Sequence, residues 1–220
     1  GLVIGAMCKR EKANDVLISR DGKTLDDLPL GAKVATGSLR RRSQLLAYRP
    51  DLKISDIRGN VPTRFRKFDE SDLDAMVLAY AGVERLGLGD RISQVIATDV
   101  VIPAVGQGSV AGEVRSEDKE IAVIVARLDD AATRSCISAE RAFLRRLEGG
   151  CQVPIGGYAT LENDLLTLEG VVASIDGKCV YRESRSGSMD DPEALGLALA
   201  EALLAAGADS VLGEARAVAN

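Results

Sequence analysis

Short apolar runs alternate with amphipathic stretches along the first half of the chain. The runs at residues 2–7, 15–18, 33–35, 53–57 and 75–80 have the length and the bounding turn residues of buried strands. Between the later runs, apolar residues follow a helical spacing, which predicts helices over residues 39–48, 61–68 and 82–86. Strands separated by single short helices are typical of βαβ units, so we expect a largely parallel sheet.

The pattern changes in the second half of the chain. We expect a short helix over 91–96, an apolar segment over 100–103, and a helix over 119–128 with its apolar residues on one face. An amphipathic helix is predicted over 132–147, where a double glycine ends it. Three strands follow at 155–161, 165–175 and 179–187, and their short polar connectors predict an antiparallel meander. Helices over 192–206 and 209–215 are expected to pack on this meander.

These elements predict an α/β fold with two units. The first is a doubly wound α/β domain over residues 14–102, and the second is an α+β domain over residues 131–220 that holds the three-stranded antiparallel sheet. The segment between them begins with a Gly-rich stretch. Gly106 and Gly108 could cradle a phosphate, but a lone GxG is more often a plain turn or a hinge.

Positive charge is concentrated in residues 36–67. This stretch holds seven arginines and two lysines against two aspartates, in a chain whose formal net charge is −5. Such an excess indicates an anionic ligand, although arginine-rich helices are often only solvated faces. Ser38 can cap the helix, so Arg40 and Arg41 fall in its first turn, where a cation is unfavourable unless an anion compensates it. The cluster from Arg58 to Arg64 repeats this design, and both clusters should face the same sheet edge.

Composition excludes several classes of protein. The chain has no histidine, which removes Ser-His-Asp catalysis and His-ligated metal sites. The four cysteines show no CxxC spacing, so we predict no metal site and favour the reducing cytoplasm over a disulfide framework. A pI near 5.0 with 3% aromatic residues argues against nucleic-acid binding. No apolar run reaches the roughly 20 residues of a membrane span.

Cys151 differs from the other cysteines because it directly follows the double glycine. A thiol in such a loop is either exposed and reactive or buried and inert, and the sequence leaves both readings open.

Five segments resemble, in order, successive motifs of the porphobilinogen deaminases, also called hydroxymethylbilane synthases. They are SLRRRSQLL, IRGNVPTR, AYAGVERLGL, VIPAVGQG and RAFLRRLEGGCQVPIGGYA. The resemblance runs along the whole chain. It implies a transferase of tetrapyrrole and haem biosynthesis, which condenses four porphobilinogen molecules head to tail into 1-hydroxymethylbilane and releases ammonia at each step. It also implies a domain of the type II periplasmic-binding-protein kind for residues 14–102.

The resemblance implies a set of binding residues as well. The family builds its product on a dipyrromethane cofactor held by a thioether, and every pyrrole carries an acetate and a propionate that suit bidentate arginines. By motif, the cofactor-binding residues are Cys151, which bears the thioether, and Thr36, Ser38, Arg40 and Arg41. The residues expected to hold the substrate or the growing chain are Arg58, Arg64 and Arg85.

The sequence also departs from the family pattern. We expect the first domain of the family, about 90 residues with the SMKD-type motif that bears the catalytic Asp, to be absent from this chain. No catalytic residue is therefore assigned, residues 1–13 are interpreted as a remnant of that domain, and residues 103–130 as its hinge and return segment. We expect a monomer that is inactive alone and needs the missing segment. The alternative is a non-catalytic anion-binding fragment that loads no cofactor. Gly37 replaces a common Ser and Pro62 lies within the RGN turn, but neither change removes a charged ligand.

Overall fold

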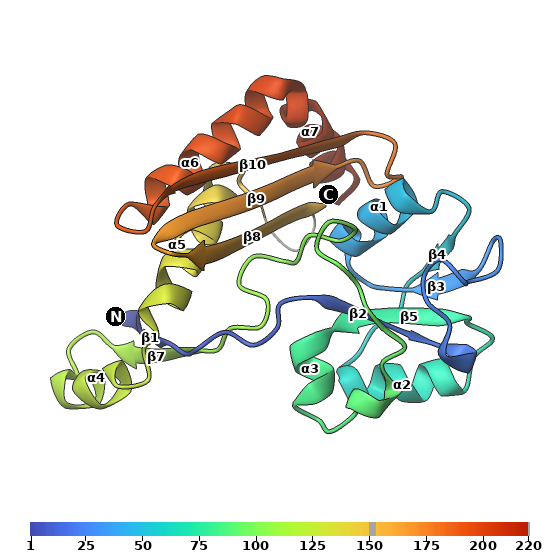
Figure 1. Ribbon diagram of the computed structural model, residues 1–220, viewed down its shortest axis with the longest axis horizontal. Helices are drawn as coiled ribbons and strands as arrows, with labels where there is room; N and C mark the ends of the chain where they lie inside the picture. Colours follow the sequence, from blue (N-terminus) through green and yellow to red (C-terminus); the bar gives the residue numbers. More distant parts are fainter. Residues whose placement is uncertain (150–152, 220) are drawn as a thin grey trace.

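Three sheets organise residues 1–149 and 153–219, the part of the chain that the computed structural model describes (Figure 1). The largest has five strands in the spatial order β4 (Lys53–Ser55), β3 (Lys33–Ala35), β5 (Ala75–Ala79), β2 (Asp15–Ser19) and β6 (Gln94–Val95). The expected mixed α/β architecture is therefore confirmed, together with its three-stranded antiparallel sheet.

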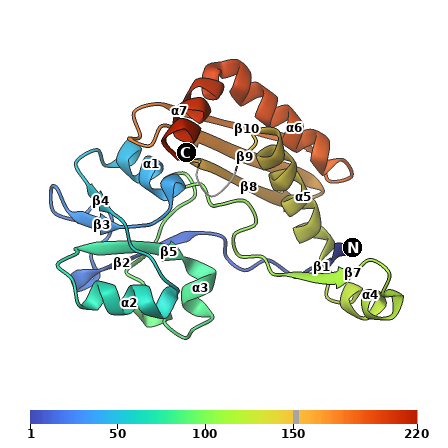
Figure 2. The same ribbon diagram turned by 180° about the vertical axis from the view of Figure 1, so that it is seen from behind.

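Helices cover both faces of the five-stranded sheet. They are α1 (Leu39–Tyr48) on the face toward the C-terminal lobe, and α2 (Val61–Asp69) and α3 (Tyr80–Glu84) on the other (Figures 1 and 2). Successive residues of β2 alternate between the two cores: Leu17 packs on the α1 side, whereas Val16 and Ile18 pack on the α2 side. Burial on both faces explains why these strands are continuous apolar runs.

The expectation of a largely parallel sheet was only partly right. Strands β3, β4 and β5 are parallel, but β2 pairs antiparallel with both β5 and β6. The helix expected over residues 91–96 was wrong. A 3-10 turn, Gly89–Arg91, leads instead into β6, whose neighbours Ser93 and Ile96 donate backbone hydrogen bonds to Leu17 and Asp15 of β2. The edge of β2 offers free backbone carbonyl groups to this segment. Pairing with them outweighs the helical spacing of apolar residues over 91–96.

The N-terminal strand pairs with a distant segment. Strand β1 (Leu2–Met7) is antiparallel to β7 (Ala111–Arg115), and α4 (Lys119–Ala126) packs on the pair through Val125. The chain therefore leaves this small sheet, builds the five-stranded sheet, and returns. The outgoing and returning segments run side by side, with Glu11 donating a backbone hydrogen bond to Gly108 at 3.0 Å. Apolar residues of α4 remain exposed among the described residues, including Ile124.

The C-terminal lobe is a meander covered by helices. Its sheet has the order β10 (Val180–Ser188), β9 (Leu165–Ala173) and β8 (Ile155–Glu162), all antiparallel, as predicted. The helices are α5 (Ala131–Arg146), α6 (Pro192–Leu203), a π-helical turn (Leu204–Ala208) and α7 (Asp209–Ala219). The expectation that no apolar stretch reaches the length of a membrane span was wrong, because Pro192–Ala215 is apolar and long enough to cross a membrane. In this structure the stretch packs on β8–β10 and buries Leu199 and Leu203 in the core of the lobe.

Close contact between α5 and α6 depends on one glycine. A Cβ at Gly196 would lie 2.3 Å from the carbonyl oxygen of Ala139 and 2.8 Å from the backbone nitrogen of Phe143. We expect Gly196→Ala to lower the free energy of unfolding by about 1–3 kcal/mol, because the two helix backbones must separate. Urea denaturation measures this. Gly213→Ala in α7 is the matched control, since no atom lies within 4 Å of its Cβ position, and equal midpoints for the two variants would contradict the packing argument.

Candidate functional site

Two of the predicted arginines meet a carboxylate inside the protein. Arg40 and Arg41 begin α1 and are only 4% and 7% exposed, and Asp15 at the start of β2 is fully buried between them. The Nη1 atom of Arg40 donates to Oδ2 of Asp15 at 2.6 Å. The Nε atom of Arg41 donates to Oδ1 at 2.9 Å, and its Nη2 atom forms an ion pair with the same oxygen at 2.8 Å. The anion that the first turn of this helix requires is thus supplied, in part, by the chain itself.

One positive charge in this cluster remains uncompensated. Two guanidinium groups share a single carboxylate, and their other acceptors are the neutral carbonyl oxygens of Ile102 and Val77 and the side chain of Gln107. The Nε atom of Arg40 is buried and has no hydrogen-bond partner among the described residues. A buried charge in excess and an unpaired donor both favour an anionic ligand here.

Burial and the two arginines shift the pKa of Asp15 in opposite directions. Burial raises it, but the charges and hydrogen bonds of Arg40 and Arg41 outweigh burial and lower the pKa of Asp15 to about 2. Asp15 is therefore ionised at neutral pH and committed to two arginines. It is not free to exchange a proton with a substrate.

The ends of two parallel strands position these groups. Thr36, just after β3, donates its backbone N–H to the carbonyl oxygen of Ser55 at the end of β4. Ser38 caps α1 by accepting a hydrogen bond from the backbone N–H of Arg41, and its own N–H donates to the Thr36 hydroxyl. Asn60 caps α2 in the same way at the neighbouring strand end. The prediction that both clusters lie at one sheet edge is confirmed by the parallel register of β3 and β4.

A second buried carboxylate holds the returning segment. Glu140 of α5 is fully buried, and it accepts hydrogen bonds from the guanidinium of Arg10 and from the backbone N–H groups of Gly106 and Ala159. Burial raises the pKa of Glu140, whereas these donors oppose that shift. The Nε atom of Arg10 also donates to the carbonyl oxygen of Gln107 at 2.9 Å. Gln107 in turn donates to Asp15. The loop that contains Gly106 and Gln107 is therefore hydrogen-bonded to both buried carboxylates, Glu140 and Asp15.

A pocket of about 360 Å³ opens beside this network. It lies between the five-stranded sheet and the C-terminal lobe, and its walls are Gly37, Ser38, Arg40, Ala104, Val105, Leu144, Val153 and Ile155. The polar groups come from the start of α1 and the apolar ones from the loop after Ile102 and from α5 and β8. Such a lining suits an anion attached to an apolar body.

The other predicted arginines are placed differently. Arg64 is half-buried and donates from Nε to the carbonyl oxygen of Gly59, and burial and the charge of Arg41 lower its pKa. Arg58 is exposed and lies 3.6 Å from Asp56. Arg85 is exposed and makes no side-chain hydrogen bond or ion pair with a described residue. Arg64 thus lies near the buried pair, whereas no hydrogen bond or ion pair among the described residues joins Arg58 or Arg85 to it.

Cys151 lies outside the described residues, so its predicted role stays a prediction. Val153, two positions further along the chain, lines the pocket. The sequence reasoning missed Asp15, Glu140, Arg10 and Gln107. Two signals were available. Asp15 opens a strand whose next three residues are apolar, and Glu140 falls between Ile137 and Phe143 at the spacing of the buried face of α5.

The sequence matches one family over most of its length. Residues 1–123 match the family described as "Porphobilinogen deaminase, dipyromethane cofactor binding domain", and residues 134–205 match "Porphobilinogen deaminase, C-terminal domain". The chain belongs to the porphobilinogen deaminase family. The enzyme of Pelotomaculum thermopropionicum is 57% identical over 98% of this chain and 69% of its own length. That of Carboxydothermus hydrogenoformans is 52% identical over 100% and 71%, and that of Brevibacillus brevis 54% over 97% and 69%.

Proposed function

We propose that this chain acts as a porphobilinogen deaminase, a transferase that condenses porphobilinogen into 1-hydroxymethylbilane with release of ammonia. The observation that carries the proposal is the buried excess of positive charge at the start of α1, where Arg40 and Arg41 share the single carboxylate of Asp15. A ligand made of pyrrole rings with carboxylate arms would bring the missing negative charge and place its rings on the apolar wall of the adjacent pocket.

The residues of the pocket fit a dipyrromethane cofactor attached to Cys151. The unpaired Nε atom of Arg40 and the hydroxyl of Ser38 can donate to its carboxylates, and Leu144 and Val153 can contact its rings. Thr36, held 2% exposed, fixes the backbone from which Ser38 projects. When bound, the cofactor supplies the free α-carbon of a terminal pyrrole as the nucleophile. The protein contributes charge, orientation and exclusion of water.

Three further arginines can hold carboxylates outside the pocket. Arg64 is half-buried and lies close enough to Arg41 for that charge to lower its pKa, whereas Arg58 and Arg85 are exposed. A bidentate guanidinium recognises a carboxylate through both charge and geometry. We assign Arg58, Arg64 and Arg85 to the carboxylates of the substrate and of the growing chain.

None of the described residues that line the pocket is a carboxylic acid, and Asp15 is committed to its arginines. A proton must nevertheless move at each condensation. No described residue is therefore assigned to this proton transfer. Residues 14–102 and 131–220 would act as two domains joined through residues 103–130, the first of the type II periplasmic-binding-protein kind, in a cytoplasmic monomer.

Covalent attachment tests the proposal directly. After incubation with porphobilinogen or 1-hydroxymethylbilane, the intact mass of the chain should increase by two linked pyrrole units, mapped to the peptide that contains Cys151. Cys151→Ser should gain no mass and keep its urea midpoint, whereas Cys179→Ser, which removes an exposed thiol, should be modified normally. An unmodified Cys151 in the unaltered chain would overturn its assignment as the attachment point.

A further inference from the structure

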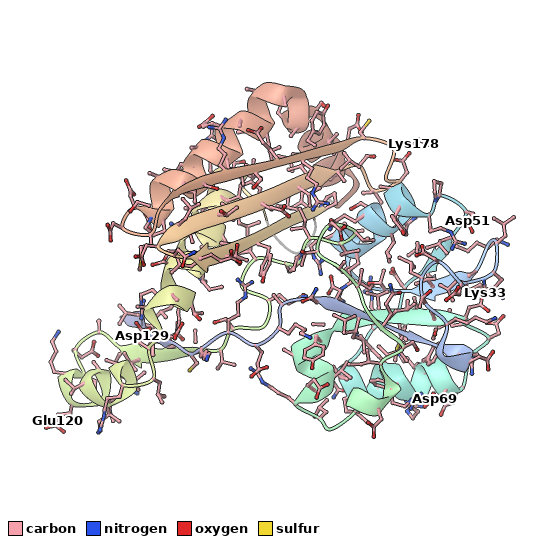
Figure 3. All side chains as sticks on the ribbon, in the orientation of Figure 1. Lys33, Asp51, Asp69, Glu120, Asp129 and Lys178 are labelled. Carbon is pink, nitrogen blue, oxygen red and sulfur yellow. The ribbon has the colours of Figure 1, made fainter. Side chains whose placement is uncertain are left out.

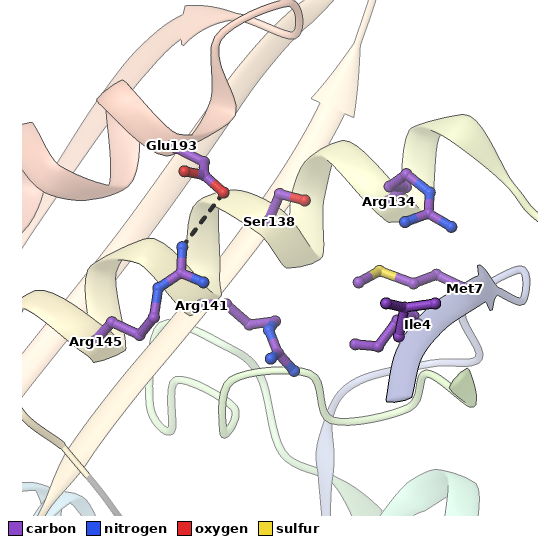
Figure 4. A pocket seen from close by; sticks show the side chains of 8 residues that line it. Ile4, Met7, Arg134, Ser138, Arg141, Arg145 and Glu193 are labelled. Carbon is purple, nitrogen blue, oxygen red and sulfur yellow. Dashed lines mark hydrogen bonds and ion pairs between the residues drawn. The ribbon is translucent and has the colours of Figure 1, made fainter. Parts of the chain in front are cut away.

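A second basic pocket lies between α5 and β1 (Figure 4). It has a volume of about 280 Å³, and its walls are Val3, Ile4, Met7, Arg134, Ser138, Arg141, Arg145 and Glu193. A smaller pocket of about 120 Å³ adjoins it and shares Ile4, Met7 and Arg141. Arg141 therefore stands where the two pockets meet.

Of the three arginines in the larger pocket, two already have acidic partners. Arg134 (Figure 4) donates to both oxygens of Asp129, which is labelled in Figure 3, at 2.7 and 2.8 Å. Arg145 forms an ion pair with Glu193 of α6 at 3.3 Å. Arg141 makes no side-chain hydrogen bond or ion pair with a described residue, and it is exposed. With Arg134 and Arg145 neutralised by their partners, the pocket offers the guanidinium of Arg141 and a net charge of +1.

The groups around Arg141 suit a small amphipathic anion. Ile4 and Met7 point from β1 toward α5 and form an apolar wall (Figure 4). The hydroxyl of Ser138, one helical turn before Arg141, has no hydrogen-bond partner among the described residues. A single uncompensated cation favours a net charge of −1 over a phosphate dianion. The volume, about 280 Å³, lies just below the roughly 300–1,000 Å³ typical of ligand pockets, which suits one ring with short arms.

We infer that Arg141, Ser138, Ile4 and Met7 form a second binding site, for a single aromatic ring that carries a carboxylate. The inference rests on the proposed function for its ligand: porphobilinogen is one pyrrole ring with two carboxylates and one ammonium group, a net charge of −1. Arg141 binds a carboxylate, and the ring lies on Ile4 and Met7.

The two sites share one loop. Ala104 and Val105 line the first pocket, and Gly106 and Ser109 line the smaller pocket beside Arg141. Glu140 of α5 accepts a hydrogen bond from the backbone N–H of Gly106 and so ties this loop to α5. A porphobilinogen molecule bound at Arg141 therefore contacts the same loop that lines the first pocket. We assign the second site to the initial binding of substrate.

Methyl NMR of the 220-residue chain tests the site. The chain has only three methionines, so the Met7 methyl resonance can be assigned by substitution. We expect it to shift saturably on addition of porphobilinogen and to respond much less to the same concentration of inorganic phosphate. Arg141→Gln should weaken this binding about tenfold or more, the effect of a lost charged hydrogen bond. Arg127→Gln, which removes another exposed arginine without a side-chain partner among the described residues, should leave it unchanged.

The Val105 methyl resonances report separately on the first pocket. A shift at Val105 without one at Met7 would overturn the second site and leave the proposed function standing. A shift at Met7 that Arg141→Gln abolishes, without one at Val105, would support the second site and count against the proposed function. Equal affinities of Arg141→Gln and the unaltered chain at Met7, or an equal response to phosphate, would overturn the inference.

Discussion

Asp15→Asn should cost the protein about 3–5 kcal/mol of unfolding free energy, because it leaves two buried guanidinium groups without their carboxylate. Arg40 and Arg41 cannot move to solvent without dismantling the first turn of α1, which the Ser38 cap holds in place. Urea denaturation at pH 7, followed by circular dichroism, measures the loss. The matched control is Asp69→Asn, which breaks a surface pair with Arg91 (Figure 3) and should cost no more than about 1 kcal/mol.

The same variant gives a pH signature. The pKa of Asp15 is about 2 in the folded chain, compared with 3.8 as its ordinary value. Because the folded-state pKa is depressed, the stabilisation is complete above pH 3.8 and is lost as the pH falls toward 2. The difference in stability between the unaltered chain and Asp15→Asn should therefore be constant near neutrality and shrink by about 2 kcal/mol over that interval. A difference that stays constant down to pH 2 would refute the assignment.

Glu140→Gln should be the second severe substitution, with a loss of about 3–5 kcal/mol. The amide presents one oxygen to three groups that all donate: the Arg10 guanidinium and the backbone N–H groups of Gly106 and Ala159. Arg10 would remain buried without its counter-ion. Hydrogen exchange should show the local consequence as faster exchange at Gly106 and Ala159, which connect the loop and β8 to α5.

The control for Glu140 is another glutamate paired with an arginine. Glu201→Gln removes the exposed partner of Arg146, and we expect a change within about 1 kcal/mol. If Glu140→Gln is as stable as Glu201→Gln, Glu140 does not anchor the loop, and the link between the two buried carboxylates would have to be abandoned.

Local pattern was enough to predict most of the elements. The capped helix after Lys33–Ala35, the three strands of the C-terminal sheet and the helices that cover it all follow from hydrophobic periodicity and turn residues. The direction of β2 could not be predicted, since a buried strand reads the same in either orientation. The short strand β6 was missed because its pairing comes from the free edge of β2, far away in the sequence.

The sequence predicted the location of the site but not the hydrogen bonds and ion pairs within it. Charge concentration and the family motifs identified Arg40 and Arg41, but their burial and their shared partner depend on how β2 lies against α1. Asp15 and Arg40 are separated by 25 residues, and Glu140 and Arg10 by 130. No local pattern encodes such pairs. The sequence can, however, show an acidic residue at a position that the hydrophobic pattern predicts to be buried. Such a residue is expected to have a basic partner elsewhere in the chain.

The pairing of β1 with β7 also bears on synthesis at the ribosome. Leu2 finds its register partner only at Arg115, so β1 must wait for its partner until the chain has been translated as far as β7. During that interval the five-stranded sheet, which lies wholly between the two strands, can collapse as an autonomous unit. The folded five-stranded sheet already holds β1 and β7 near each other. Pairing them then costs much less loop-closure entropy than their separation in the sequence suggests.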